Sequence, residues 1–372
     1  MTRANRKTKS NVGLGAIPAE ALRHLFPKLR LPIQPPFPPA EAKSVSEIPS
    51  EAGWLYEPKW DGFRCLAFRD GREIVLQSKA GQPLTRYFPE LVEALRELPD
   101  NKFVVDGEII IRGKTGLDFN ALLQRIHPAA SRIQRLSQET PATLLIFDLL
   151  VAGTKTLTAQ PLSARRMSLQ EFAAQFNDRR QVKLSPATTD MDKAQCWFRQ
   201  GAASGLDGVV AKRLECEYTS GERTGMVKIK RIRTADCVVG GFRWAQKGGQ
   251  VGSLLLGLYN DSGQLDHVGF SARFTKPDRK KLKAILKPLK GGEGFTGKTP
   301  GGPSRWTRED RNTEWFPLKP GLVCEVQYDH FSGGRFRHGT KFLRWRPEKQ
   351  PAQCTFEQVL PNQPDALPKL GL

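Results

Sequence analysis

The sequence predicts a mixed α+β protein of two domains. The chain has 372 residues, and this length, at about 150 residues per domain, favours two. Up to residue 232, aliphatic runs typical of strands alternate with segments whose apolar residues recur at helical spacing. Beyond Arg233 the runs are short and are separated by glycine and aspartate turns. This change of pattern places a domain boundary near Arg233.

Residues 1–30 are expected to form a basic, loosely ordered extension before the first domain. They contain seven lysines and arginines and one glutamate, with one short amphipathic stretch around 19–25. The segment at 31–40, LPIQPPFPPA, is rich in proline and is typical of extended chain. We therefore start the first domain at residue 31.

The first domain, 31–232, combines helices and strands and is therefore α+β. Apolar residues at helical spacing predict helices at 86–98, 118–127, 163–176 and 192–203. β-branched and aliphatic runs predict strands at 103–111, 143–150, 206–212 and 226–232.

The second domain, 233–360, is predicted to be a small barrel. Strands are expected at 237–242, 253–259, 265–270 and 322–328, with one helix at 276–286. About five strands and one helix in about 125 residues suit a barrel of the OB type. Residues 361–372 are expected to form a C-terminal tail.

Composition excludes several classes of protein. No apolar run approaches the roughly 18 residues of a membrane-spanning helix, and the first 30 residues lack the apolar core of a secretory signal. The six cysteines are scattered and form no C-x-x-C pair, which argues against a zinc cage or a disulfide framework. A reducing cytoplasm is the expected environment, and no membrane is expected as a partner.

The net charge of +20 indicates a polyanionic partner. Residues 233–372 hold 23 lysines and arginines against 13 acidic residues, with aromatic residues interleaved. Lysine and arginine contact phosphates, and aromatic rings stack on bases. The sequence therefore favours nucleic acid as the partner.

The run GEGFTGKT at 292–299 matches the P-loop pattern but is rejected as a phosphate-binding loop. A P-loop follows a buried strand and opens a helix, whose N-terminus holds the phosphate. Here Lys287-Pro288-Leu289-Lys290 precedes the run, and Pro300-Gly301-Gly302-Pro303 follows it and cannot continue as a helix. We interpret the run as a basic loop on the barrel.

The most informative segment for chemistry is EPKWDGFR at 57–64. It has the pattern K-x-D-G-x-R, in which Lys59 is a candidate nucleophile in a phosphate-binding pocket. The plainer interpretation is a surface pair of Lys59 and Asp61 at the end of a strand. Companion motifs that follow in order along the chain weaken that interpretation.

Carboxylates and lysines recur at the later strands. Asp106-Gly107-Glu108 interrupts an apolar run, Phe147-Asp148 ends another, and Asp207 precedes a third. A carboxylate within a strand is costly to bury without a partner. Lys228 and Lys230 share one face of a strand because side chains alternate, and two inward lysines need a polyanion such as a triphosphate.

These motifs resemble those of the covalent nucleotidyltransferases, and specifically of the ATP-dependent DNA ligases. The likeness is greatest to small bacterial ligases of the ligase C type and to the ligase module of bacterial end-joining enzymes, and it covers about residues 33–360. The segments that carry it are 59–64, 78–81, 106–108, 147–148, 207–212, 228–230 and 342–349. The resemblance implies an adenylation (nucleotidyltransferase) domain with antiparallel sheets and flanking helices, followed by an OB-fold domain.

The resemblance also implies a role for each candidate residue. Lys59 becomes adenylated by ATP, Glu57 recognises adenine, and Phe147 stacks on the adenine ring. Arg64 and Glu108 contact the ribose or the DNA end, and Glu108 and Asp207 are candidate ligands for Mg²⁺ or Mn²⁺. Lys79 is expected to bind the nucleotide, and Lys228 and Lys230 to bind its phosphates. Lys349, with Arg344 or Arg346, is expected to orient the pyrophosphate leaving group.

Two residues depart from the family pattern. The fourth motif usually begins with glutamate, whereas Asp207 is shorter by one methylene, so a metal held there must lie closer or bind through water. Lys79 stands where arginine is usual, which removes one bidentate contact.

The implied activity is sealing of 5′-phosphate/3′-hydroxyl breaks in nicked or broken double-stranded DNA, in DNA repair. An RNA ligase or an mRNA-capping guanylyltransferase of the same superfamily stays open as an alternative, and a non-catalytic nucleic-acid-binding protein is a remote one. A NAD-dependent ligase is disfavoured because its zinc-binding cysteine cluster is absent. We expect a monomer in the bacterial cytoplasm, associated with the nucleoid, with repair or end-joining proteins acting in trans.

Overall fold

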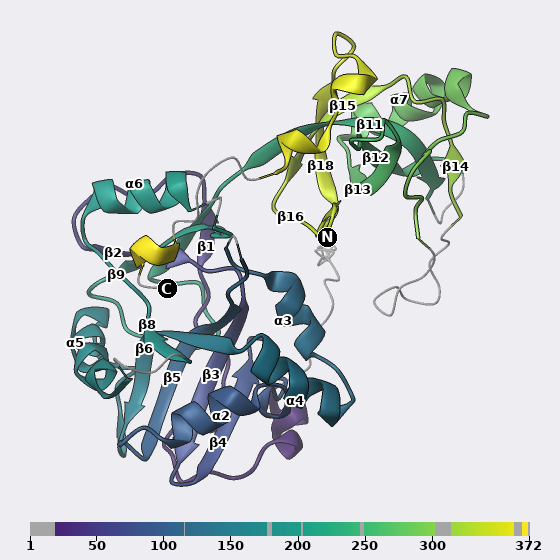
Figure 1. Ribbon diagram of the computed structural model, residues 1–372. Coiled ribbons are helices and arrows are strands. Elements are labelled where there is room, and N and C mark those ends of the chain that lie inside the picture. The colour runs from purple at the N-terminus through teal and green to yellow at the C-terminus, as the bar shows by residue number, and fades with distance from the viewer. Residues whose placement is uncertain are drawn as a thin grey trace, which may run out of the picture. The chain divides into compact units, whose positions relative to one another are not determined.

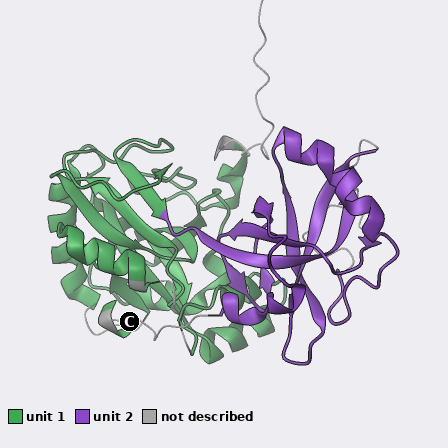
Figure 2. Ribbon diagram, turned by 90° about the horizontal axis from the view of Figure 1, so that it is seen from above, with its two compact units in different colours: residues 1–229, 365–372 green, residues 230–364 purple. Residues whose placement is uncertain are grey.

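The computed structural model describes residues 19–114, 116–176, 181–201, 204–245, 249–301, 314–360 and 367–370. The chain forms two compact units, which Figure 2 shows in separate colours. Unit 1 consists of Met1–Ile229 with Asp365–Leu372, and unit 2 of Lys230–Pro364. The domain limits placed at 31, 233 and 361 from the sequence stay predictions.

A mainly antiparallel sheet forms the body of unit 1 (Figure 1). Its strands follow the order β4-β3-β5-β6-β7, and β8 pairs with β6 in parallel. The strands are β3 (Phe63–Asp70), β4 (Glu73–Ser78), β5 (Lys102–Ile111), β6 (Ala142–Ala152), β7 (Lys155–Thr156) and β8 (Val182–Leu184). The predicted strands at 103–111 and 143–150 are confirmed as β5 and β6.

A second, smaller sheet has the order β1-β10-β9-β2. Its strands are β1 (Lys43–Val45), β2 (Trp54–Lys59), β9 (Gly208–Arg213) and β10 (Met226–Lys230). β2 is the last strand in this order, and such an end position tolerates Pro58 because proline has no N–H to give to a ladder. β2 pairs with β9 in antiparallel register, which sets Lys59 opposite Gly208.

The helices of unit 1 are short and flank the sheets. They are α1 (Ala19–Leu22), α2 (Pro89–Arg96), α3 (Phe119–Arg125), α4 (Ala130–Glu139), α5 (Leu162–Ala173) and α6 (Met191–Gln200). The predicted helices at 86–98, 118–127 and 163–176 are confirmed as α2, α3 and α5, and α6 matches the fourth over the described residues. α4 was not predicted, because Ile133 and Leu136 alone make up its aliphatic face.

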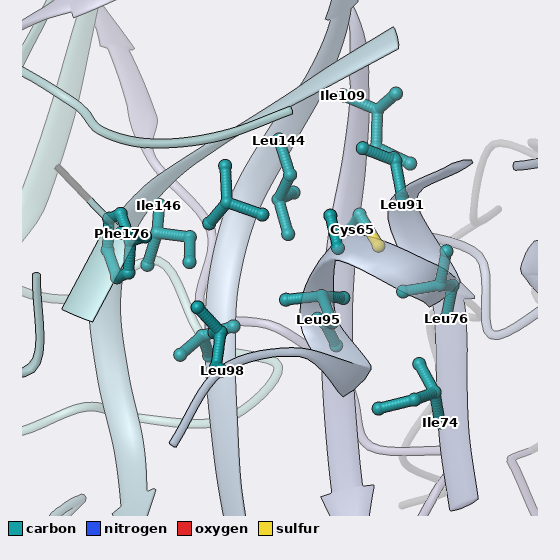
Figure 3. Close-up of a cluster of buried hydrophobic side chains, with 14 of the residues drawn as sticks. Cys65, Ile74, Leu76, Leu91, Leu95, Leu98, Ile109, Leu144, Ile146 and Phe176 are labelled. Carbon is teal, nitrogen blue, oxygen red and sulfur yellow. The ribbon is translucent and has the colours of Figure 1, made fainter. Parts of the chain in front are cut away.

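The main core of unit 1 lies between α2 and one face of the larger sheet. Pro89 begins α2, where its missing N–H removes no helical hydrogen bond. Leu91 and Leu95 are fully buried and face side chains of the strands, among them Leu76 and Leu144 (Figure 3). The period of the helix and the alternation along each strand thus direct their apolar residues to one layer.

The opposite face of the same sheet is covered by the segment before β1. Leu66 and Phe68 of β3 point to this face, and they pack with Leu29, Leu31 and Ile33. All five side chains are buried. The proline-rich lead-in is therefore part of the core of unit 1, together with Leu29, which precedes it.

Unit 2 contains a closed β-barrel. β12, β13, β18, β15 and β11 are neighbours in that order, and an added pairing of β12 with β11 closes the ring. The strands are β11 (Arg233–Trp244), β12 (Val251–Tyr259), β13 (Leu265–Arg273), β15 (Val323–Tyr328) and β18 (Thr340–Trp345), with β14 (Phe316–Pro317) beside β11 and a small β16–β17 hairpin (Phe331–Ser332, Arg335–Phe336). One helix of three turns, α7 (Lys276–Leu286), accompanies them. The predicted OB-type barrel is confirmed, including its helix.

The run at 292–299 is not a P-loop. Residues 291–301 contain neither helix nor strand, and Phe295 is buried in the core of unit 2. In the described part of the chain, no helix is long and apolar enough to cross a membrane.

Candidate active site

A cavity of about 190 Å³ opens in unit 1, lined by strands of both sheets. β2, β9 and β10 contribute residues from the smaller sheet, and β3, β5 and β6 from the larger one. Its lining residues are Glu41, Ala42, Glu57, Pro58, Lys59, Trp60, Arg64, Lys79, Glu108, Phe147, Val210, Lys212, Met226 and Lys228. Motifs spread over 170 residues of sequence therefore meet at one site.

Lys59 is the last residue of β2, and its ammonium forms an ion pair with Asp207. The distance from Nζ to Oδ2 is 2.5 Å, and the Asp207 backbone N–H donates to the carbonyl of Lys59 at 2.8 Å. The Asp207 side chain is 6% exposed and that of Lys59 20%. The carboxylate of the fourth motif thus holds the lysine of the first.

The turn after Lys59 is fixed by the close approach of β5. A Cβ on Gly62 would lie 2.2 Å from the carbonyl oxygen of Ile109. No side chain fits there, which is a steric reason for the glycine of the K-x-D-G pattern.

Glu57 lies at the buried end of the cavity, between two cations. Its Oε2 is 2.8 Å from Nζ of Lys212, and its Oε1 is 3.8 Å from a guanidinium nitrogen of Arg166. The residue is 3% exposed. Oε1 has no hydrogen-bond partner within the described part of the structure, so it is free to accept a hydrogen bond from a ligand.

Phe147 presents an aromatic ring to the cavity from β6. Nζ of Lys212 lies 4.3 Å from the ring centroid, and Cζ of Arg64 lies 4.9 Å from it. Both distances are within the range of cation–π attraction. The ring is 8% exposed, so the packing of its neighbours holds it in place.

Arg64 is held by Asp106, the first acidic residue of the third motif. Nε and Nη2 of Arg64 donate to the two oxygens of Asp106 at 2.7 and 2.6 Å. The hydroxyl of Tyr218 donates to the same carboxylate at 2.6 Å, and Asp106 is fully buried. Although burial opposes charge, this carboxylate raises the pKa of Arg64 above its usual value. Asp106 therefore positions Arg64.

Glu108 lines the cavity, and its pKa lies above the ordinary value of a carboxyl group. Desolvation raises the pKa of Glu108 to about 7, although Lys59 and Arg64 act to lower it. A carboxyl group in this state gains from any further cation brought near it.

Lys79 and Lys228 line the same cavity from two other elements. Nζ of Lys79 lies 3.2 Å from Oε1 of Glu41, and half of the Lys79 side chain is exposed. Lys230 ends β10, is exposed and is absent from the cavity lining, so Lys228 alone of the two lysines predicted to face a triphosphate lines the cavity.

The three predicted pyrophosphate-orienting residues lie in unit 2, where acidic side chains hold them. Nη1 of Arg346 donates to both oxygens of Asp236 at 2.8 and 3.0 Å, and Nζ of Lys349 lies 2.8 Å from the same carboxylate. Nε of Arg344 donates to Glu325 at 2.7 Å.

Two residues of the cavity, Lys212 and Glu41, were not predicted, and neither was Asp236, which holds basic residues within unit 2. Lys212 is the last residue of the fourth motif and lies two residues after Val210 in β9. Because side chains alternate along a strand, Val210 and Lys212 both face the cavity, and the strand period could have predicted this. Glu41 follows the proline-rich segment and carries no motif. Asp236 is a lone carboxylate in a strand, and its partners are more than 100 residues away.

The described residues contain no group of three or more histidine, cysteine, aspartate or glutamate side chains that would hold a metal by themselves. Mg²⁺ is commonly bound by one or two carboxylates with waters and substrate phosphates. The raised pKa of Glu108 and its place in the cavity are consistent with a site of that kind.

Comparison with known proteins places these observations in a family. The family described as "ATP dependent DNA ligase domain" matches residues 39–230, and the one described as "ATP dependent DNA ligase C terminal region" matches residues 247–349. DNA ligase C1 of Mycolicibacterium smegmatis is 47% identical over 339 residues, covering 88% of this chain and 95% of that protein. DNA ligase C of Mycobacterium tuberculosis is 45% identical over 349 residues, covering 89% and 96%.

More distant relatives show how far the likeness extends. The multifunctional non-homologous end joining DNA repair protein LigD of Mycobacterium tuberculosis is 30% identical over 309 residues, covering 82% of this chain and 37% of that protein. A solved structure of a Lig E DNA ligase has a TM-score of 0.52 at 16% identity and covers 82% of this chain and 100% of its own. That structure supports the fold alone.

Proposed function

Because the chain belongs to the ATP-dependent DNA ligases, we propose that Lys59 accepts AMP from ATP and passes it to the 5′-phosphate of broken duplex DNA. The observation that carries this proposal is the Lys59–Asp207 ion pair inside a cavity that also contains Glu57 and Phe147. The matched families and relatives are DNA ligases, so the RNA-ligase and capping alternatives are set aside.

The first step forms a phosphoramide on Lys59. Nζ must lose a proton before it attacks, and Oδ2 of Asp207, at 2.5 Å, is a proton acceptor already in contact with it. The nitrogen lone pair then forms a bond to the α-phosphorus, while the bond from that phosphorus to the α,β-bridging oxygen breaks and pyrophosphate leaves. Lys79 and Lys228 supply positive charge to the phosphate oxygens at the cavity.

Adenine recognition is assigned to the buried end of the cavity. Oε1 of Glu57, which has no hydrogen-bond partner within the described part of the structure, would accept a hydrogen bond from the exocyclic amino group of adenine. Phe147 offers a ring for stacking, and Lys212 balances the charge of Glu57. Asp106 keeps Arg64 in place beside that ring for contact with the ribose or the DNA end.

A divalent cation, Mg²⁺ or Mn²⁺, is proposed as the second cofactor. Glu108 would hold it with the nucleotide phosphates, and Asp207 is the other candidate carboxylate once Lys59 has been modified and the ion pair is lost. The cation would neutralise charge on the transferring phosphoryl group. The short side chain of Asp207 favours an indirect contact through water.

The proposed DNA substrate is a nicked or broken duplex with a 5′-phosphate and a 3′-hydroxyl. The bound AMP passes to the 5′-phosphate, and the 3′-hydroxyl then displaces AMP and closes the strand. The likeness to LigD, which is named as an end-joining DNA repair protein, supports a role in repair with partner proteins in trans. We propose that the protein works as a monomer in the bacterial cytoplasm, on nucleoid DNA.

The test is mass spectrometry of the full-length protein after incubation with ATP and Mg²⁺. One AMP per chain is expected, released by acid and stable to hydroxylamine, as for a phosphoramide. Lys59→Ala should abolish the adduct, and Lys59→Arg should abolish it as well because a guanidinium stays protonated. Lys155→Ala, on an exposed lysine that does not line the cavity, is the matched control. Full adduct on Lys59→Ala would overturn the assignment.

A further inference from the structure

Helix α7 of unit 2 carries an unusual density of positive charge. Residues 276–290 contain seven basic side chains and one acidic side chain. The acidic one, Asp278, is used at the helix N-terminus, where its Oδ2 accepts a hydrogen bond from the hydroxyl of the capping residue Thr275. The lysines of the helix are therefore left without a carboxylate on their own element.

Four of these lysines form a single stripe along α7 and the turn that follows it. Lys276, Lys280, Lys283 and Lys287 are spaced by four, three and four residues, which places them on one face of a helix. All four are exposed. Within the described part of the chain, none of them has an ion pair, a hydrogen bond to a side chain or an aromatic contact.

The helix is anchored to unit 2 by its other side. Leu282 and Leu286 are 1% exposed in the barrel core, and Arg279 donates to the carbonyls of Val251 and Ala272 at 3.2 and 3.0 Å. The lysine stripe is thus rigidly presented. Because the apolar side of α7 is already buried, the helix has no free apolar face with which to enter a membrane.

Like charges three and four residues apart destabilise a helix. The stripe contains three such pairs, and no acidic side chain in the described residues forms an ion pair with any of its lysines. A polyanion outside the protein would offset the repulsion. In a DNA ligase, the polyanion at hand is the phosphate backbone of its substrate.

We propose that the α7 lysine stripe, Lys276, Lys280, Lys283 and Lys287, binds the phosphate backbone of duplex DNA beside the break. This inference rests on the proposed function. From Lys276 to Lys287 the stripe extends about 16 Å at 1.5 Å per residue, which is about five base pairs at 3.4 Å each. The stripe would bind through charge alone, so it would contribute affinity and no base preference.

The test compares three full-length variants in equilibrium binding to a nicked duplex over a range of salt. In Lys280→Gln/Lys283→Gln/Lys287→Gln, the slope of log K against log salt should fall by about 2 to 3, at about 0.9 per lost phosphate contact, and affinity at about 0.1 M salt should fall at least about tenfold. Lys280→Arg/Lys283→Arg/Lys287→Arg keeps the charge and should keep the wild-type slope. The charge-matched control is Lys28→Gln/Lys114→Gln/Lys155→Gln, on exposed lysines of unit 1, and its slope should stay near the wild-type value.

A second measurement locates the contact. Wild-type affinity should fall when the duplex on one side of the nick is shortened so that the outermost five or so base pairs of the footprint are removed. The glutamine variant should show no such dependence. An unchanged salt slope in the glutamine variant, or an equal loss in the unit 1 control, would overturn the proposal. Self-adenylation should be unaffected in every variant, so failure of the stripe is distinguishable from failure of Lys59 as the nucleophile.

Discussion

Single carboxylates set the position of the basic residues that this enzyme is proposed to use. Asp207 holds Lys59, Asp106 holds Arg64, and Asp236 holds both Arg346 and Lys349. All three aspartates are buried residues. A buried carboxylate that pairs with a lysine or an arginine fixes the direction of a long side chain that would otherwise sample many rotamers.

Asp236 is predicted to be a positioning residue for the reaction with ATP. The side chain of Gln358 accepts a hydrogen bond from the Asp236 N–H at 3.0 Å and donates one to the Asp236 carbonyl at 3.1 Å. These two hydrogen bonds fix the backbone that carries the carboxylate. Asp236→Asn should lower the free energy of unfolding by about 1–3 kcal/mol, since hydrogen bonds to charged groups are of that size. It should slow adenylation about tenfold or more, a loss of about 1.4 kcal/mol in the barrier, and should change sealing of a pre-adenylated nick much less.

Rates of adenylation and of sealing from a pre-adenylated nick check this prediction. Glu348→Gln is the control, because Glu348 is exposed and contacts Arg346 from the solvent side. An equal loss in both steps would mean that Asp236 matters for stability alone.

At the scale of elements, the site depends on how closely β5 approaches the turn between β2 and β3. That approach brings Lys59 of β2 and Glu108 of β5 to one cavity, although they belong to different sheets. Gly62 is the residue that permits it, since a side chain there would collide with the backbone of β5.

Gly62→Ala is predicted to damage stability and adenylation together. The added methyl group must displace the carbonyl of Ile109 or the turn itself, and overpacking of this kind costs about 1–3 kcal/mol. Because Lys59 lies three residues away, adenylation should fall by more than the loss of folded protein explains. Gly71→Asn, in the open turn between β3 and β4, is the control: Gly71 has φ +63°, a conformation that asparagine tolerates, and nothing lies within 4 Å of its Cβ position. Denaturant unfolding and the AMP adduct measured on both variants would decide the matter, and a stable, fully active Gly62→Ala would contradict it.

At the scale of the whole molecule, the two ends of the sequence both belong to unit 1. The chain passes through unit 2 and returns, so that Leu367 is fully buried in a cluster with Trp60, Ile110, Leu145 and Leu206. Trp60 and Leu206 are the immediate neighbours of Lys59 and Asp207 in the sequence. Leu367 therefore packs against the sequence neighbours of the proposed nucleophile and of its carboxylate partner.

Leu367→Ala is predicted to destabilise unit 1, although the residue lies five positions from the C-terminus. Truncating a fully buried leucine costs about 2–5 kcal/mol, and Leu370→Ala should cost less because Leu370 is only partly buried. Thermal or denaturant unfolding of the full chain measures both. A loss below about 0.5 kcal/mol for Leu367→Ala, the size of an ordinary surface substitution, would show that the tail is not part of the core.

The fold and most of the candidate site could be predicted because their signals are local. The spacing of apolar residues predicted α2, α3, α5 and α7. The short apolar runs separated by glycine and aspartate turns beyond Arg233 predicted the barrel. The K-x-D-G-x-R pattern and its companions pointed to Lys59, Glu57, Phe147 and Glu108, which the structure brings to one cavity.

The pairings between distant residues were decided by the tertiary structure alone. The ion pair of Asp207 with Lys59, the pairs of Asp236 with Arg346 and Lys349, and the burial of Leu367 join residues that no local pattern connects. Sequence periodicity gives the face on which a side chain lies, but the partner of that face is set by how sheets and barrel strands pack. The sequence therefore determines which chemical group each position carries, and the packing of the folded chain determines which other residue that group contacts.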